Sequence, residues 1–106
     1  MTPVRNIPRG RVSRREASVE ASIVSALEAA GWAVRKFTAR KANPDRICIR
    51  GGRVFLLEIK RPGETPDSLQ AHAIDEWADY APVAVVRSTA EAMAFADRVS
   101  MLEAVA

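Results

Sequence analysis

Three charged residues that could take part in catalysis or metal binding lie at the two ends of an apolar stretch. The stretch is NPDRICIRGGRVFLLEIK and covers residues 43 to 60. Asp45 precedes the first apolar run, and Glu58 and Lys60 end the second. The two glycines between the runs suit the positive φ angles of a two-residue hairpin turn. In such a hairpin Asp45 pairs with Glu58, and the alternation of side chains places Lys60 on the same face. The hairpin is therefore predicted to gather two carboxylates and an ammonium group.

Two carboxylates that face each other across a hairpin repel unless something offsets their charge. Mg²⁺ prefers oxygen ligands of this kind, so a metal site is one interpretation of the pair. The alternative is an exposed strand end, where both acids form surface ion pairs with Lys60 and Arg61 that stabilise the fold little. The hairpin residues by themselves do not decide between the two.

Glu20 is a further candidate acid, outside the hairpin. On a helical wheel it lies in the middle of the apolar stripe formed by Ile23, Val24 and Leu27. Stabilisation by the helix dipole explains it poorly, because Glu20 lies too far from the helix start. A carboxylate that faces the protein interior needs a partner, so we expect Glu20 to reach the hairpin acids.

The surrounding sequence predicts the elements that position these residues. Capping residues, glycine stops and apolar periodicity indicate the order α-β-β-β-α-β-α, an α/β fold. The predicted elements are a helix over 14–30 that begins at the capping box of Ser13 and Glu16, strands at 32–37, 45–50 and 53–60, a helix from Thr65 or Asp67 to Tyr80 with an apolar stripe of Leu69, Ala73, Ile74 and Trp77, a strand at 83–86 and a helix over 89–102.

Composition limits the class of protein. The 106 residues suffice for one domain. A single cysteine, Cys48, excludes an internal disulfide framework, and a single histidine, His72, excludes a Cys/His zinc cluster. No signal peptide or run of membrane-spanning length is present, so we expect a cytoplasmic protein.

Charge is divided unevenly along the chain. Residues 1–61 hold 14 Lys and Arg against five acids, a net charge of +9, while 62–106 hold two against eight, a net charge of −6. A basic leader of this kind suits phosphate backbones, although a solvated tail explains residues 1–12 equally well. We expect a flexible basic arm over 1–12 and a single domain over 13–106.

Taken together, these residues resemble the PD-(D/E)xK nuclease superfamily and, more narrowly, its VRR-Nuc (virus-type replication-repair nuclease) domain. The resemblance covers most of the chain, from about residue 16 to 88, through VEASIVSALEAAGWAVRKF, NPDRICIRGGRVFLLEIKRPG and SLQ. It implies a restriction-endonuclease-like core with a central mixed sheet flanked by helices. The matching residues are Glu20, Pro44-Asp45, Glu58-Ile59-Lys60 and Gln70.

Two positions depart from the family pattern. Ala42 stands at the glycine of Gly-x-Pro-Asp, and Asp67 replaces the serine three residues before Gln70. Asp67 and Gln70 can form a capping box, so Gln70 stays open between a role in chemistry and a role in helix capping.

The resemblance implies a metal-dependent endonuclease. Asp45 and Glu58, with the carbonyl of Ile59, would hold Mg²⁺ or Mn²⁺, and Glu20 would join them directly, through water or at a second metal. The metal would polarise the phosphate and activate water. Lys60 would orient that water or steady the developing charge, as a point-charge ammonium group can.

The resemblance also implies the partners. Gln70 would position water or a phosphate, and basic residues would contact the DNA backbone without reading its sequence. Stand-alone members of the family look like phage-type enzymes that act on four-way junctions. We therefore expect a Holliday-junction-resolving homodimer of phage or prophage type in a bacterial or phage-infected cell. The alternative is a non-catalytic nucleic-acid-binding accessory module with the same fold. The basic residues are Arg14, Arg15, Arg35, Lys36, Arg40, Lys41, Arg46 and Arg61.

Overall fold

A computed structural model describes residues 14–38 and 42–102 of the chain. The element order is the predicted α-β-β-β-α-β-α. The elements are α1 (Arg14–Ala29), β1 (Ala33–Lys36), β2 (Arg46–Arg50), β3 (Arg53–Ile59), α2 (Ser68–Ala78), β4 (Val83–Val86) and α3 (Thr89–Ser100). The predicted basic arm and the capping box of Ser13 with the Glu16 side chain lie outside the described part.

The four strands form one mixed sheet in the order β1-β2-β3-β4. The first three strands are antiparallel, and β4 runs parallel to β3 on the far edge. The turn between β2 and β3 is the predicted two-glycine turn, since Gly51 and Gly52 have φ angles of 57° and 80°. The hairpin has the register that a two-residue turn sets, with the pairs Arg50↔Arg53, Ile49↔Val54 and Ile47↔Leu56.

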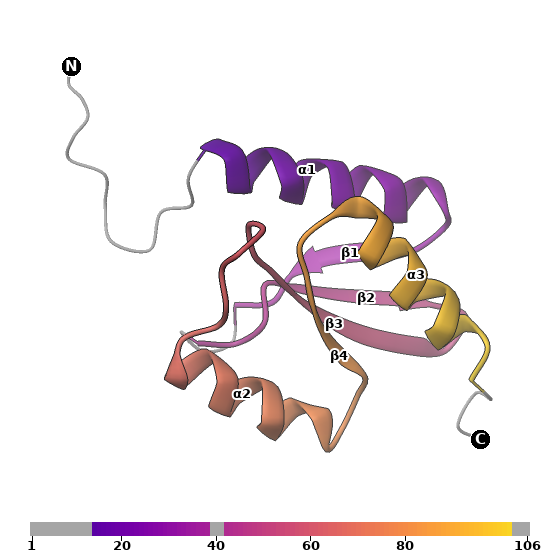
Figure 1. Ribbon diagram of the computed structural model, residues 1–106. Coiled ribbons are helices and arrows are strands. Elements are labelled where there is room, and N and C mark those ends of the chain that lie inside the picture. Colours follow the sequence, from indigo (N-terminus) through magenta and orange to yellow (C-terminus); the bar gives the residue numbers. More distant parts are fainter. Residues whose placement is uncertain (1–13, 39–41, 103–106) are drawn as a thin grey trace.

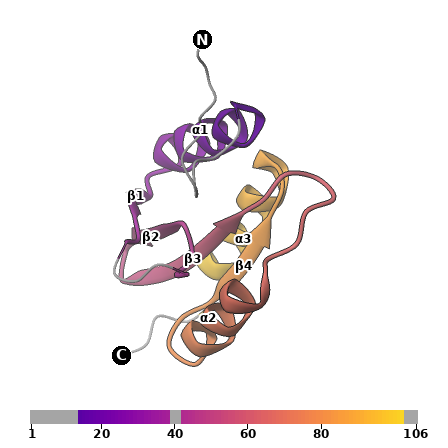
Figure 2. The same ribbon diagram turned by 90° about the vertical axis from the view of Figure 1, so that its left-hand side faces the viewer.

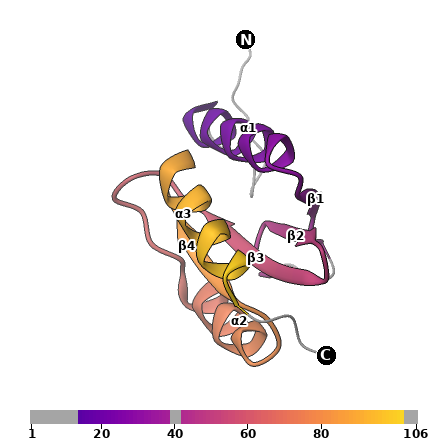
Figure 3. The same cartoon turned by 90° about the vertical axis from the view of Figure 1, so that its right-hand side faces the viewer.

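Helices cover both faces of the sheet (Figure 1). Figures 2 and 3 show α1 and α3 together on one side, with α2 on the opposite side. The main core lies between the sheet and the α1–α3 layer, because the inward side chains of β3 meet the apolar stripes of both helices. Its members are Ile23, Leu27, Trp32, Val34, Cys48, Phe55, Leu57, Ile59, Val86, Ala92, Ala96 and Val99.

The end of α1 follows from one glycine. Gly31 has a φ of 95°, the N–H of Trp32 donates to the carbonyl of Leu27 (3.0 Å), and the N–H of Gly31 donates to that of Glu28 (3.0 Å). This pattern is a Schellman motif, which satisfies the last carbonyls of the helix and turns the chain into β1.

The apolar stripe predicted for α2 is wrong at its first member. Ala73 is buried, but Leu69 is 71% exposed. Helical spacing places Leu69 near the correct face, but it does not reveal that the first turn of α2 has no cover over that side chain. None of the helices that the structure describes is long and apolar enough to cross a membrane.

Candidate active site

Asp45 lies where the β2–β3 ladder ends. The ladder stops at Arg46↔Leu57, so the predicted pair of Asp45 with Glu58 lies one step beyond it. The N–H of Asp45 instead donates to the carbonyl of Leu57 (2.8 Å), the residue already paired with Arg46. Its carboxylate turns back and accepts a hydrogen bond from the N–H of Ile59 (2.8 Å). Asp45 is thereby held against the last residues of β3.

Glu58 is a buried acid on the face of β3 opposite the main core. It is 1% exposed, while its neighbours Leu57 and Ile59 belong to the core cluster on the other face. The ammonium group of Lys60 lies 3.5 Å from Glu58 Oε2. A buried carboxylate costs several kcal/mol of desolvation unless it is paired, so this placement is more than an exposed strand end. The surface-ion-pair alternative therefore does not describe Glu58.

Glu20 reaches this end of the sheet from α1, but it meets an arginine there. Its Oε2 accepts a hydrogen bond from Nε of Arg46 (2.8 Å), with side-chain exposures of 19% and 16%. The N-terminal half of α1, the start of β2 and the end of β3 lie at the same end of the molecule (Figure 1). Glu20 thus faces the protein and pairs with Arg46, and its membership of one site with the hairpin acids stays a prediction.

The electrostatics link these groups. Burial and, next, the negative charge of Glu20 raise the pKa of Asp45 above its ordinary value of 3.8. The hydrogen bond from Ile59 and the positive charges of Lys60 and Arg46 oppose this rise in pKa. Asp45 therefore stands within the electrostatic reach of another acid and two cations, a pattern that is common at functional sites.

Two contacts of Trp77, which the sequence did not predict, fix the segment just before Asp45. The indole N–H of Trp77, on α2, donates to Oδ1 of Asn43 (3.0 Å), and the Trp77 ring meets that of Phe37 edge-on at 4.9 Å between centroids. Asn43 is 8% exposed, and Pro44 is fully buried. The sequence assigned Trp77 only to the apolar stripe of its helix, since nothing local indicates a partner 34 residues away.

Gln70 takes part in the predicted capping box. Its Oε1 accepts from the N–H of Asp67 (3.0 Å), and its own N–H donates to Asp67 Oδ1 (2.8 Å). The departure from the family pattern at Asp67 thus has a structural use, because both residues satisfy free N–H groups at the start of α2. The side-chain carbonyl of Gln70 is engaged in capping.

Two arginines hold the segment after Lys60 through hydrogen bonds to Glu64. Arg61 forms an ion pair with Glu64 (2.6 Å), which lowers the pKa of that carboxyl. Arg87, which follows β4, donates from Nε and Nη2 to the carbonyl of Glu64 (3.0 and 2.7 Å). The N–H of Lys60 itself donates to the carbonyl of Val86 (3.0 Å). The backbone around Lys60 is therefore fixed from β4.

The predicted DNA-contacting residues have different positions. Lys36 is exposed at the end of the edge strand β1, directly across from Arg46, and Arg35 is exposed beside it. Arg61 and Arg46 are each engaged with an acid. The backbone of Arg14 and Arg15 forms the first turn of α1, but their side chains lie outside the description, as do Arg40 and Lys41 entirely.

The residues fit a divalent metal ion in part. Among the residues described, no group of three His, Cys, Asp or Glu side chains is arranged to hold one. Asp45 and Glu58 are nevertheless hard oxygen donors held at the end of β3, next to the backbone of Ile59, which is the chemistry that Mg²⁺ selects. The third predicted ligand, Glu20, is engaged by Arg46.

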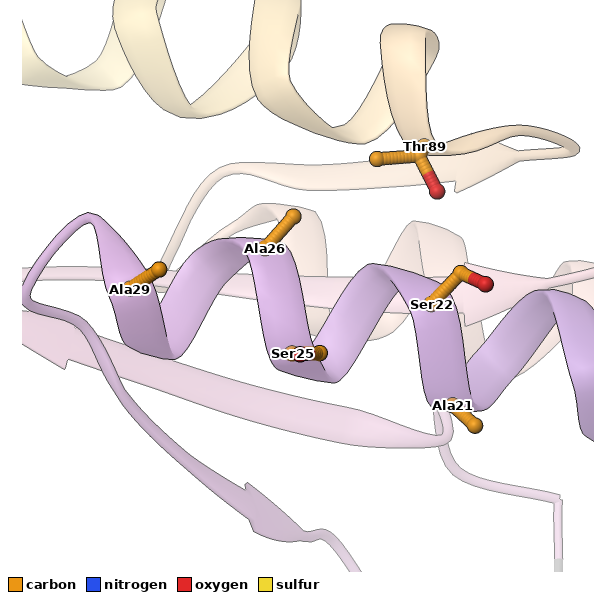
Figure 4. Close-up of a pocket in the computed structure, with 6 residues that line it drawn as sticks. All are labelled: Ala21, Ser22, Ser25, Ala26, Ala29 and Thr89. Carbon is orange, nitrogen blue, oxygen red and sulfur yellow. The ribbon is translucent and has the colours of Figure 1, made fainter.

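The shallow hollow in Figure 4 is separate from these residues. It is lined by Ala21, Ser22, Ser25, Ala26 and Ala29 of α1 and by Thr89 at the start of α3. Because its lining carries methyl and hydroxyl groups and no charged side chain, it offers nothing that would bind a metal ion or hydrolyse a phosphate. The charged cluster at the end of β3 is the stronger candidate site.

Comparisons with known proteins indicate the family and the fold. A family model described as archaeal Holliday junction resolvase (Hjc) matches residues 11–102. A solved structure described as a VRR_NUC domain superposes with a TM-score of 0.69, at 23% identity, over 80% of this chain and 97% of that one. No curated protein matches the chain. The predicted resemblance is confirmed for the fold, and the family model lies in the same nuclease superfamily.

Proposed function

The chain belongs to the archaeal Holliday junction resolvase family, and from this premise we propose that it is a metal-dependent DNA endonuclease selective for branched DNA, above all four-way junctions. The observation that carries the proposal is the placement of buried Glu58 and partly buried Asp45 beside Lys60 at the end of β3. A nucleic-acid-binding module gains nothing from carboxylates near phosphates, because like charges repel.

Asp45, Glu58 and the carbonyl of Ile59 would hold Mg²⁺ or Mn²⁺, with Glu20 as a further ligand. The bound ion would supply positive charge to the phosphate and lower the pKa of water. Lys60 would orient the attacking water and stabilise negative charge as one P–O ester bond breaks. Hydrolysis leaves a phosphate monoester and a hydroxyl group.

The chain's basic residues would position the DNA. Lys36 and Arg35 present their charges on the edge strand, and phosphate contacts of this kind fix register without reading sequence. Gln70, which caps α2, would act on water or a phosphate only through the part of its side chain that capping leaves free. Because one site cuts one strand, we propose a homodimer that nicks a junction twice. A bacterial or phage-infected cytoplasm is the proposed setting, with a phage or prophage origin.

The test uses labelled four-way junction, flap, nicked and linear duplex DNA with Mg²⁺ or Mn²⁺. The wild-type protein should introduce paired nicks into the junction. Asp45→Asn and Lys60→Met should bind the junction but not cut it, whereas Asp75→Asn, which changes an exposed acid of α2, should cut normally. Light scattering should show a dimer.

The alternative, a non-catalytic accessory module, has its own signature. If the wild-type protein binds junctions but leaves every substrate intact with both metals, and Asp45→Asn binds as well or more tightly, the enzyme proposal is refuted and the module remains. Cutting of linear duplex at the same rate as the junction would refute the proposed selectivity.

A further inference from the structure

The contact between Glu20 and Arg46 joins a candidate metal ligand to a candidate DNA contact. Arg46 donates to Glu20 from Nε. Among residues 14–38 and 42–102, no hydrogen bond engages its two terminal nitrogens, so both can donate to a further acceptor. The side chains are 16% and 19% exposed, so the pair is shielded but not sealed from solvent.

Arg46 has a second charged neighbour. Lys36, exposed on the edge strand β1, lies directly across from it in the antiparallel ladder. Like charges placed directly opposite each other destabilise a sheet unless a negative group lies between or beside them. Glu20 now supplies that negative group. A DNA phosphate would supply it equally well, and a phosphate can accept two hydrogen bonds from one guanidinium group.

Glu20 is also coupled electrostatically to Asp45, because its negative charge helps to raise the pKa of that carboxyl. A carboxylate oxygen that accepts a short bond from Arg46 is a poorer metal ligand, since the arginine neutralises it and fixes its direction. Glu20 therefore has two competing partners, the guanidinium group of Arg46 and any cation bound by the acids at the end of β3.

We propose that Arg46 is a positioning residue that holds Glu20 in the nucleic-acid-free protein and exchanges it for a DNA phosphate seated on Lys36 and Arg46. Glu20 then becomes available to the metal only when DNA is bound. The inference rests on the proposed function, and it adds a coupling between metal and DNA. By linkage, each ligand strengthens the binding of the other by the same factor.

The first experiment measures Mg²⁺ affinity by calorimetry without DNA, so no cleavage enters. Arg46→Met should bind Mg²⁺ about fivefold or more tightly than wild type, because Glu20 is released. In a Glu20→Gln background the same substitution should change the affinity by less than about twofold. Arg46→Lys, which keeps a cation beside Glu20, should restore most of the wild-type affinity.

Arg53→Met is the matched control, because Arg53 lies at the other end of the hairpin and donates to the carbonyl of Leu102. Its Mg²⁺ affinity should equal that of the wild type. Circular dichroism on each variant establishes that the fold is retained.

The second experiment measures binding of a labelled four-way junction in EDTA by fluorescence anisotropy. Glu20→Gln should bind the junction about threefold or more tightly than wild type, because Arg46 is freed for phosphate. This gain should disappear when Arg46→Met is present as well. The second measurement tests the same Glu20–Arg46 contact by releasing Arg46 instead of Glu20, and it needs no metal.

The outcomes separate the two proposals. The exchange is overturned if Arg46→Met changes Mg²⁺ affinity equally in the wild-type and the Glu20→Gln protein, or if Arg53→Met changes it as much as Arg46→Met does. In either case Arg46 affects the metal only through its positive charge. A wild-type protein that binds Mg²⁺ and cuts junctions without this coupling leaves the nuclease proposal standing. A wild-type protein that neither binds metal nor cuts overturns both.

Discussion

Replacing Trp77 by phenylalanine tests how the loop before Asp45 is held. The variant keeps an aromatic ring against Phe37 but removes the N–H that donates to Asn43 Oδ1 at 3.0 Å. Asn43 is 8% exposed, so water cannot easily replace the lost donor. A buried acceptor left without a partner costs about 1–3 kcal/mol. We therefore expect the free energy of unfolding to fall by about 2 kcal/mol.

The assay is urea or thermal denaturation followed by circular dichroism. For a domain of this size, about 2 kcal/mol corresponds to a melting temperature lower by roughly 10 °C. Tyr80→Phe is the matched control, because Tyr80 is 81% exposed and should change stability by less than about 0.5 kcal/mol. Combining Trp77→Phe with Asn43→Leu should recover part of the loss, since both polar partners are then gone.

The same substitution should weaken the site, because Asn43 lies two residues before Asp45. Loss of a group that orients a ligand costs about 10- to 100-fold in metal affinity. We expect Trp77→Phe to reduce Mg²⁺ affinity within that range at a temperature where the variant is folded. If the variant is as stable as the wild type, the Trp77–Asn43 hydrogen bond does not stabilise the fold. If it is destabilised but binds Mg²⁺ normally, the bond does not position Asp45.

Three further predictions concern Asp45, Cys48 and Arg87. Burial and Glu20 raise the pKa of Asp45 in the folded protein above its ordinary value of 3.8. The protonated carboxyl therefore contributes to the free energy of unfolding below pH 3.8, and this contribution is lost as the pH rises through the pKa of the folded state. Asp45→Asn should thus raise the metal-free melting temperature more at pH 7 than at pH 3.5, and an equal change at both would contradict this. Burial raises the pKa of Cys48 to about 12, so native protein at pH 8 should resist iodoacetamide until urea unfolds it; rapid labelling of folded protein would be the contrary result. Arg87→Met should free the Glu64 carbonyl and lower junction cleavage more than junction binding, while equal losses of both would disprove a role in placing Lys60.

Much of the fold could be predicted because its signals are local. The Gly51-Gly52 turn sets which residues of the hairpin pair, and the period-two alternation then assigns Leu57 and Ile59 to one face and Glu58 to the other. Gly31 ends the first helix by the same kind of short-range argument. The capping box of Asp67 and Gln70 was equally readable, since it spans only one helical turn.

The faces on which the candidate residues lie could be predicted better than their contacts. The wheel position of Glu20 indicates that it faces the protein, but not that it meets Arg46, 26 residues later in the chain. The alternation of the hairpin places Asp45 opposite Glu58, but the ladder ends one residue earlier, and the Asp45 carboxylate turns to the N–H of Ile59.

The sequence by itself determined the order of helices and strands, the hairpin register and the types of groups at the end of β3, because each depends on backbone preferences and side-chain periodicity over a few residues. Only the tertiary structure decided which charges are buried and which partners they have. Burial depends on how far one element extends over another, which is why Leu69 is exposed while Trp77 reaches Asn43. A side chain's desolvation and its partners are properties of the packed layers, and no short stretch of chain contains them.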